Sequence, residues 1–188
     1  MQAYFWFDPT CPYTWLTSRW LVEAAAVRPI SITWRLLSLS ALNEHLDVDP
    51  EGDTEGHLWL PARVCAAVEL AHGSEALRRF YERLHELDDW DWDWAKALEA
   101  AGLPAALAAA ADSTEFDDHL RASTAEGVAK VGSHVGTPII AVENGPAWFG
   151  PVISQVPAGE AAGALWDATV VVAGTPGFHE LKGGPHAL

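Results

Sequence analysis

FWFDPTCPYTW, residues Phe5–Trp15, is the stretch that decides the fold of this chain of 188 residues. An apolar, aromatic run ends at Asp8-Pro9, and a cysteine followed at once by proline, Cys11-Pro12, comes directly after this corner. A short apolar run that stops at such a corner is typical of a buried strand, and proline is favoured in the first turn of a helix. The sequence therefore predicts a strand over Ala3–Phe7, a helix from Pro12 and Cys11 at their junction.

A cysteine at the start of a helix lies beside unsatisfied backbone N–H groups and the positive end of the helix dipole. A free thiol has a pKa of about 8.5, and helix N-termini lower that value into a range of roughly 3.5 to 7.5. We therefore expect Cys11 to have a lowered pKa and to react as a thiolate. The alternative is a small side chain that only fills the joint between strand and helix.

Thr14 stands where a second cysteine is common after a cysteine placed like Cys11. Its hydroxyl lies one helical turn after Cys11, where it can donate a hydrogen bond to an anionic sulfur. The alternative is a hydroxyl that only bonds back to the turn. Thr14 cannot form a disulfide, so a thiol that resolves a mixed disulfide has to come from outside this pair. A low-molecular-weight thiol is the natural candidate.

Thr137-Pro138, after a glycine, is the second predicted part of the site. A proline that opens a strand is a position where cis peptide bonds occur, and an ordinary trans turn is the alternative. In the cis form, the backbone groups before the proline are free to dock an extended thiol compound. We expect this loop to face Cys11.

The rest of the chain completes one fold. Ile30–Leu36 alternates apolar and polar residues, as a half-buried strand does, and the acidic segment 44–56 is predicted to be a surface loop. Helices are predicted across about 57–132, one of them capped by Ser74 with an apolar stripe of Leu77, Phe80, Tyr81, Leu84 and Leu87. Two strands around the Asn144-Gly145 turn and a helix over about 159–173 follow. This β-α-β, helices, β-β-α order predicts an α/β thioredoxin fold with an inserted helical subdomain, in one domain over 1–188.

Composition excludes several classes of partner. Eleven basic and 26 acidic residues give a net charge of −15, which repels nucleic acid and anionic membrane surfaces. No apolar run is long enough to span a membrane, and the N-terminus does not resemble a secretory signal, so we expect a cytoplasmic protein. The histidines and the two cysteines lack metal-site spacing, so no metal is expected, and Cys65 is predicted to be a buried, inert thiol.

FWFDPTCPYTWLTSRWL, VGTP before a strand, AWFGPVIS and GEAAGALWDA resemble the DsbA-like thioredoxin-fold oxidoreductases of actinobacteria. The resemblance is strongest to the mycothiol-dependent nitroreductase family. It implies an enzyme with a helical lid that uses mycothiol to reduce disulfide or nitro compounds, with Cys11 as nucleophile and Thr137-Pro138 as the cis-proline loop. Members of the family commonly carry a second cysteine where this chain has Thr14, so the resemblance implies a monothiol route through a mixed disulfide of Cys11.

These observations predict the residues of the site. We expect Cys11 and Thr14 to be catalytic. The residues expected to bind mycothiol, as co-substrate beside a small disulfide or nitro compound, are Pro12, Tyr13, Trp15, Thr137 and Pro138. Trp15 and Trp59 are candidates to line the cleft. The run DDWDWDW at 88–94 is expected to be structural, and His134 is expected to be a solvated loop residue.

Two other functions stay open. One is a thiol-cofactor transferase or isomerase, like the kappa-type glutathione transferases and the hydroxychromene carboxylate isomerases. The other is a redox-silent binding module that keeps the groove without turnover. A homodimer is also left open.

Overall fold

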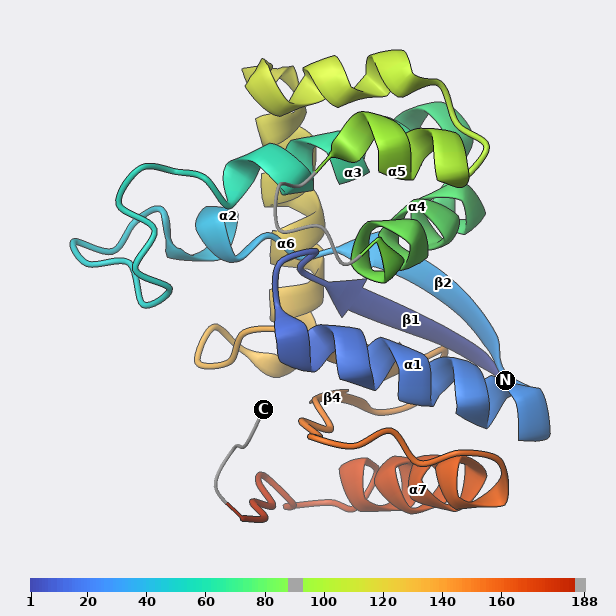
Figure 1. Cartoon of the computed structure of the whole chain (residues 1–188). Coiled ribbons are helices and arrows are strands. Elements are labelled where there is room, and N and C mark those ends of the chain that lie inside the picture. The colour runs from blue at the N-terminus through green and yellow to red at the C-terminus, as the bar shows by residue number, and fades with distance from the viewer. Residues whose placement is uncertain (88–92, 185–188) are drawn as a thin grey trace.

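A four-stranded mixed sheet forms the centre of the computed structural model, which describes residues 1–87 and 93–184 (Figure 1). Its strand order is β2-β1-β3-β4. β1 runs parallel to β2 and antiparallel to β3, and β4 runs antiparallel to β3. The strands are β1 (Gln2–Phe7), β2 (Ser31–Leu36), β3 (Ile139–Val142) and β4 (Ala147–Phe149). The predicted thioredoxin fold is confirmed.

Helices cover both faces of the sheet. Phe5 and Phe7 of β1 belong to the main core with Trp20 and Trp166 from two helices on one face, whereas Trp6 packs on the other face against a third helix. In the described residues these helices are α1 (Pro12–Val27), α2 (Leu39–Asn43), α3 (Trp59–His72), α4 (Ser74–Glu86), α5 (Trp94–Ala100), α6 (Asp117–Val131) and α7 (Glu160–Ala173), with 3-10 segments at Ala105–Asp112 and Thr114–Phe116. We call α3, α4, α5, α6 and the two 3-10 segments the helical block.

Ser74 does not cap α4 as predicted. Gly73 precedes the helix and Ser74 is its first residue. The Ser74 hydroxyl accepts a hydrogen bond from the Trp34 N–H at 2.7 Å and donates one to the Trp34 carbonyl at 3.1 Å. β2 is an edge strand, so these backbone groups have no neighbouring strand to pair with. Ser74 satisfies them and joins the helical block to the sheet.

The acidic tryptophan run lies partly outside the described residues, which omit 88–92. Asp93 accepts a hydrogen bond from the Lys96 N–H at 3.0 Å as the N-cap of α5, and Trp94 packs against the main core. Both residues therefore have the structural role that was predicted.

Within 1–87 and 93–184, no helix combines the length and the apolar character that a membrane crossing needs.

α6 approaches the sheet closely at Gly127. A Cβ atom at this position would lie 2.9 Å from Cδ1 of Trp6 and 3.0 Å from Cγ, nearer than side chains normally pack. Trp6 is fully buried, so its ring would have to shift within the packed cluster to accept a methyl group. Glycine is therefore needed here in spite of its poor helix propensity.

We predict that Gly127→Ala lowers the free energy of unfolding by about 1–3 kcal/mol, because the added methyl group overpacks the contact with Trp6. Chemical denaturation measures this change. Ala125→Gly, at an exposed position of the same helix, is the control and should be destabilising by about 1 kcal/mol from helix propensity alone. A more stable Gly127→Ala variant would contradict the packing account.

Candidate active site

Cys11 is the N-cap residue of α1, and Pro12 is the first residue of that helix. Its side chain is half-buried and packs against the apolar cluster that contains Leu37 and Leu39. The Cys11 carbonyl accepts a hydrogen bond from the Trp15 N–H at 3.1 Å. Cys11 therefore lies at the junction of strand and helix, as the sequence predicts.

Hydroxyl groups connect Cys11 to the Thr137-Pro138 loop. The groups whose donors favour the anionic form of the Cys11 sulfur are the hydroxyl and N–H of Thr14 and the N–H of Tyr13, through their effect on its pKa. The Thr14 hydroxyl, which is fully buried, lies 3.2 Å from the Thr137 hydroxyl. The Thr137 oxygen also accepts from the Asp8 N–H at 3.2 Å. The Thr137–Pro138 peptide bond is cis, and the loop lies beside Cys11.

The pKa of Cys11 is opposite to the sequence-based expectation. Burial of the sulfur, the largest effect, raises the pKa above its ordinary value. The donors of Thr14 and Tyr13 lower the pKa only in part, and the nearby charge of Asp8 raises it further. The prediction counted the donors at the helix start and left out desolvation, so the prediction of a lowered pKa was wrong. In the ligand-free protein, Cys11 is a thiol at neutral pH.

Asp8 holds the Cys11 loop in place, a role that the sequence analysis missed. Its carboxylate is fully buried and accepts hydrogen bonds from the Thr10 N–H at 2.7 Å, the Thr10 hydroxyl at 2.6 Å and the Leu39 N–H at 2.7 Å. Burial raises the pKa of Asp8, while these bonds act against that rise. The Asp-Pro-Thr sequence signals the local turn, but the bond to Leu39 at the start of α2 has no local signal.

α4 of the helical block forms a wall next to the Cys11 loop. His85 stacks on the Trp15 ring with 4.4 Å between ring centroids, and the Arg19 guanidinium lies 4.3 Å from the centroid of the same ring. Tyr81, one helical turn before His85, meets Trp15 edge to face at 5.5 Å. The predicted role of Trp15 in cofactor binding stays a prediction, because its described contacts are with protein side chains.

His85 joins this wall to the residue that follows Asp8. Its Nε2 lies 3.0 Å from the Pro9 carbonyl, which can only accept, so Nε2 carries the proton. Burial lowers the pKa of His85 to about 4, with a smaller effect in the same direction from the Arg19 charge. His85 is therefore neutral at physiological pH. Sequence analysis missed it, since nothing in its local sequence signals a contact with Pro9.

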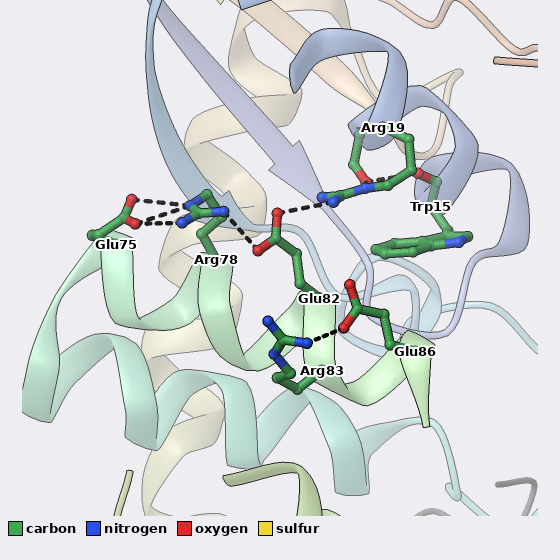
Figure 2. Close-up of polar contacts among 8 residues, drawn as sticks. Trp15, Arg19, Glu75, Arg78, Glu82, Arg83 and Glu86 are labelled. Atoms are coloured by element: carbon green, nitrogen blue, oxygen red, sulfur yellow. Dashed lines mark hydrogen bonds and ion pairs between the residues drawn. The ribbon is translucent and has the colours of Figure 1, made fainter. Parts of the chain in front are cut away.

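A series of ion pairs also connects α1 to α4 (Figure 2). Arg19 of α1 contacts Glu82 at 2.8 Å, Glu82 contacts Arg78 at 2.6 Å, and Arg78 contacts Glu75 at 2.6 Å. The Arg19 and Glu82 side chains are partly buried, so solvent screens their pair less than it screens an exposed one. These contacts hold α4 of the helical block against α1, whose N-cap is Cys11.

Trp59 lines a small cavity of about 150 Å³ next to α2. Arg63 and Arg121 each place a guanidinium 5.5 Å from its ring centroid, and Arg121 pairs with Glu44 across the cavity rim at 2.9 Å. α2 lines this cavity through Ser40 and Asn43, and its Leu39 belongs to the apolar cluster against which Cys11 packs. Its lining residues are Ser40, Asn43, Glu44, Leu46, Asp49, Asp53, Gly56 and Trp59.

The remaining predicted residues divide by exposure. Pro12 is exposed, Tyr13 is half-buried, and Pro138 is buried. Cys65 is fully buried in α3, and burial raises its pKa well above the ordinary value, which confirms the prediction of an inert thiol. His134 is exposed, as predicted.

Fold and site together define a DsbA-like protein of the thioredoxin fold. The structure is similar to a probable DsbA oxidoreductase, SCO1869 from Streptomyces coelicolor, with a TM-score of 0.57 at 14% identity over 89% of both chains. It is also similar to the cytosolic disulfide reductase DsbM from Pseudomonas aeruginosa, with a TM-score of 0.54 at 15% identity over 92% of this chain and 100% of DsbM. At these identities the likeness supports the fold alone.

Residues 10–183 match the Rv2466c-like family, described as mycothiol-dependent nitroreductase Rv2466c. The chain belongs to this family. It is also similar to the uncharacterized protein Rv2286c of Mycobacterium tuberculosis (strain ATCC 25618 / H37Rv), with 34% identity over 187 residues. This match covers 95% of this chain and 80% of Rv2286c. The family resemblance stated from the motifs is confirmed.

We predict that Thr14→Val lowers the rate of Cys11 alkylation at neutral pH about tenfold, because an anionic sulfur loses a hydroxyl donor. Iodoacetamide labelling followed over pH measures the change. Thr17→Val removes another buried hydroxyl of α1, which bonds to the Tyr13 and Pro151 carbonyls instead, and serves as the control. Equal alkylation profiles for Thr14→Val and the parent protein would contradict the assignment.

We predict that the protein loses stability as the pH falls from about 6.5 to about 4, in part through His85. His85 stays neutral in the folded state over this range while the unfolded chain takes up a proton, so acid favours unfolding. His85→Gln should remove about 2 kcal/mol of the loss between pH 7 and pH 4.5, measured by chemical denaturation. His134→Gln, at an exposed position, should leave the loss unchanged, and an equal effect of both variants would refute the role of His85.

Proposed function

We propose that this chain is a mycothiol-dependent monothiol oxidoreductase with Cys11 as its nucleophile. One observation supports it most. Half-buried Cys11 is the N-cap of α1, and the Thr14 hydroxyl one turn on lies 3.2 Å from the Thr137 hydroxyl of the proline loop, with the donors of Thr14 and Tyr13 acting to lower the pKa of the Cys11 sulfur. A sulfur with several donors and partial access to solvent suits a group that passes through an anionic state. Membership of the mycothiol-dependent family supports the identity of the co-substrate.

The proposed reaction proceeds in two exchanges. The Cys11 thiolate attacks a disulfide between substrate and mycothiol at the mycothiol sulfur, which forms a Cys11–mycothiol disulfide and releases the substrate thiolate. A second mycothiol thiolate then attacks the mycothiol sulfur of this adduct. Mycothiol disulfide leaves, and the Cys11 thiolate is regenerated. For a nitro compound, two mycothiols would supply two electrons, giving a nitroso compound, water and mycothiol disulfide.

The raised pKa of Cys11 affects both how often its thiolate forms and how readily its sulfur leaves a disulfide. A thiol of high pKa ionises rarely, but its thiolate is a stronger nucleophile and a poorer leaving group. The Cys11–mycothiol disulfide therefore persists until a second mycothiol arrives, since Thr14 offers no internal thiol. Ionisation of Cys11 has to accompany the docking of the disulfide.

The proposed binding surface consists of Pro12, Tyr13, Trp15, Thr137 and Pro138. The small cavity beside α2 would take a polar part of a thiol or substrate, because α2 also contributes Leu39 to the apolar cluster against which Cys11 packs. We treat 1–188 as one domain, with the segment of about 57–132 as an inserted lid. We also propose a cytoplasmic location, where small thiols stay reduced.

One observation favours a second function. Because Cys11 is uncharged at neutral pH in the ligand-free protein, it could orient the thiol of a bound cofactor without becoming oxidised. That would be a thiol-dependent transferase or isomerase. A redox-silent binding module would show neither turnover nor an adduct.

Incubation with mycothiol disulfide separates these functions. We predict one mycothiol adduct per chain, mapped to Cys11 by mass spectrometry and absent from Cys11→Ser. In Thr14→Cys the adduct should be released within the chain, because the introduced thiol lies one helical turn after Cys11 and can form a disulfide with it. A parent protein that forms no adduct on Cys11 would overturn the oxidoreductase proposal, and thiol-dependent turnover without an adduct would favour the transferase.

A further inference from the structure

Tyr81 of α4 has a buried hydroxyl with no hydrogen-bond partner in the described residues. The side chain is fully buried, and its oxygen is shielded from solvent. A buried hydroxyl without a partner is unfavourable, because it gives up its bonds to water for nothing. Such groups are rare in folded proteins, and a redox or catalytic role is one of their recognised causes.

The Tyr81 ring lies against both ends of the loop that carries Cys11. Its centroid is 4.1 Å from the Phe7 ring, at the end of β1, and 5.5 Å from the Trp15 ring, in the first turn of α1. The His85 ring meets it edge to face at 4.8 Å. Cys11 lies between Phe7 and Trp15 in the chain, so the phenol stands beside the cysteine loop.

A negative charge on Cys11 affects the pKa of the Tyr81 phenol. After burial, the charge of Cys11 is the largest effect on the pKa of Tyr81, and both raise it well above its ordinary value. The phenol therefore keeps its proton, and its O–H stays available as a donor. The titratable or charged groups that face Tyr81 are Cys11, Asp8, Arg19, Cys65 and His85.

We propose that the Tyr81 hydroxyl is the hydrogen-bond donor reserved for the anionic form of the Cys11 sulfur. A neutral thiol is a weak acceptor, so the hydroxyl makes no bond to it in the resting protein. Ionisation converts the sulfur into a strong acceptor, for which the unpartnered phenol beside the cysteine loop is the available donor. This inference rests on the proposed role of Cys11 as nucleophile.

The two hydroxyl donors proposed for the thiolate, Thr14 and Tyr81, come from different parts of the fold. Thr14 belongs to α1 together with Cys11, whereas Tyr81 comes from the helical block. Arg19–Glu82 and the His85–Pro9 hydrogen bond hold α4 against the cysteine loop. The thiolate is therefore stabilised fully only when the helical block is docked on α1, which links the reactivity of Cys11 to the position of the block.

Tyr81→Phe tests the proposal cleanly, because the substitution removes a hydroxyl that makes no hydrogen bond in the resting protein. We expect thermal stability that is equal to or higher than that of the parent protein, an iodoacetamide profile displaced to higher pH and a rate at pH 7 that is about tenfold lower. Tyr4→Phe is the control, in the middle of β1, where Tyr4 pairs with Thr33 and Ala141. A Tyr81→Phe profile that superimposes on that of the parent protein would overturn the proposal.

A second variant keeps the test decisive if Tyr81→Phe folds poorly. Site-specific 3-fluorotyrosine at position 81 retains the packing and is a stronger donor, so it should displace the alkylation profile to lower pH. No displacement would count against the proposal. Alkylation does not depend on mycothiol, so failure of the parent protein to form a mycothiol adduct refutes the proposed function alone, and an unchanged profile refutes the role of Tyr81 alone.

Discussion

The site depends on one buried carboxylate, that of Asp8. The carboxylate accepts hydrogen bonds from Thr10 and Leu39, and the backbone N–H of Asp8 donates to the Thr137 hydroxyl. Three segments far apart in the sequence are thereby joined: the cysteine loop, the start of α2 and the proline loop. An ionised carboxylate without these donors would be strongly unfavourable in this position. The bonds of Asp8 therefore hold the cysteine loop and the Thr137-Pro138 loop together.

The sulfur itself is subject to two opposing effects. Burial favours the neutral thiol, and the donors of Thr14 and Tyr13 favour the thiolate, with burial the larger effect. In a protein with two active-site cysteines, the second thiol can attack the mixed disulfide and release the bound thiol compound. This chain has the Thr14 hydroxyl in place of the second cysteine. Release of the Cys11 mixed disulfide therefore needs a thiol from outside the chain, and the raised pKa of Cys11 makes its sulfur a slow leaving group. Family membership and site chemistry agree on a thiol-dependent reaction.

Sequence reasoning succeeded where the signal is local and failed where it is tertiary. The strand, the proline after Cys11 and the spacing to Thr14 lie within one stretch, so the position of Cys11 and its contact with Thr14 could be predicted. The Asn144-Gly145 turn likewise identified the β3–β4 hairpin, since Asn144 adopts a positive φ of 55°. Helical periodicity indicated that Tyr81 would be buried, but not that its hydroxyl would lack a partner. The His85–Pro9 contact and the desolvation of Cys11 depend on how α4 packs against the loop, which no local pattern reports.

The central claim is that a single protein thiol forms the adduct and that its release needs a thiol from outside. The most direct measurement starts from the isolated Cys11–mycothiol disulfide and follows its loss after addition of isotopically labelled mycothiol at several concentrations. The account predicts a rate proportional to mycothiol concentration, with the label appearing in mycothiol disulfide and in re-formed adduct. Loss at a rate independent of mycothiol concentration would mean that Cys65 or another group in the chain resolves the adduct, and would contradict the account.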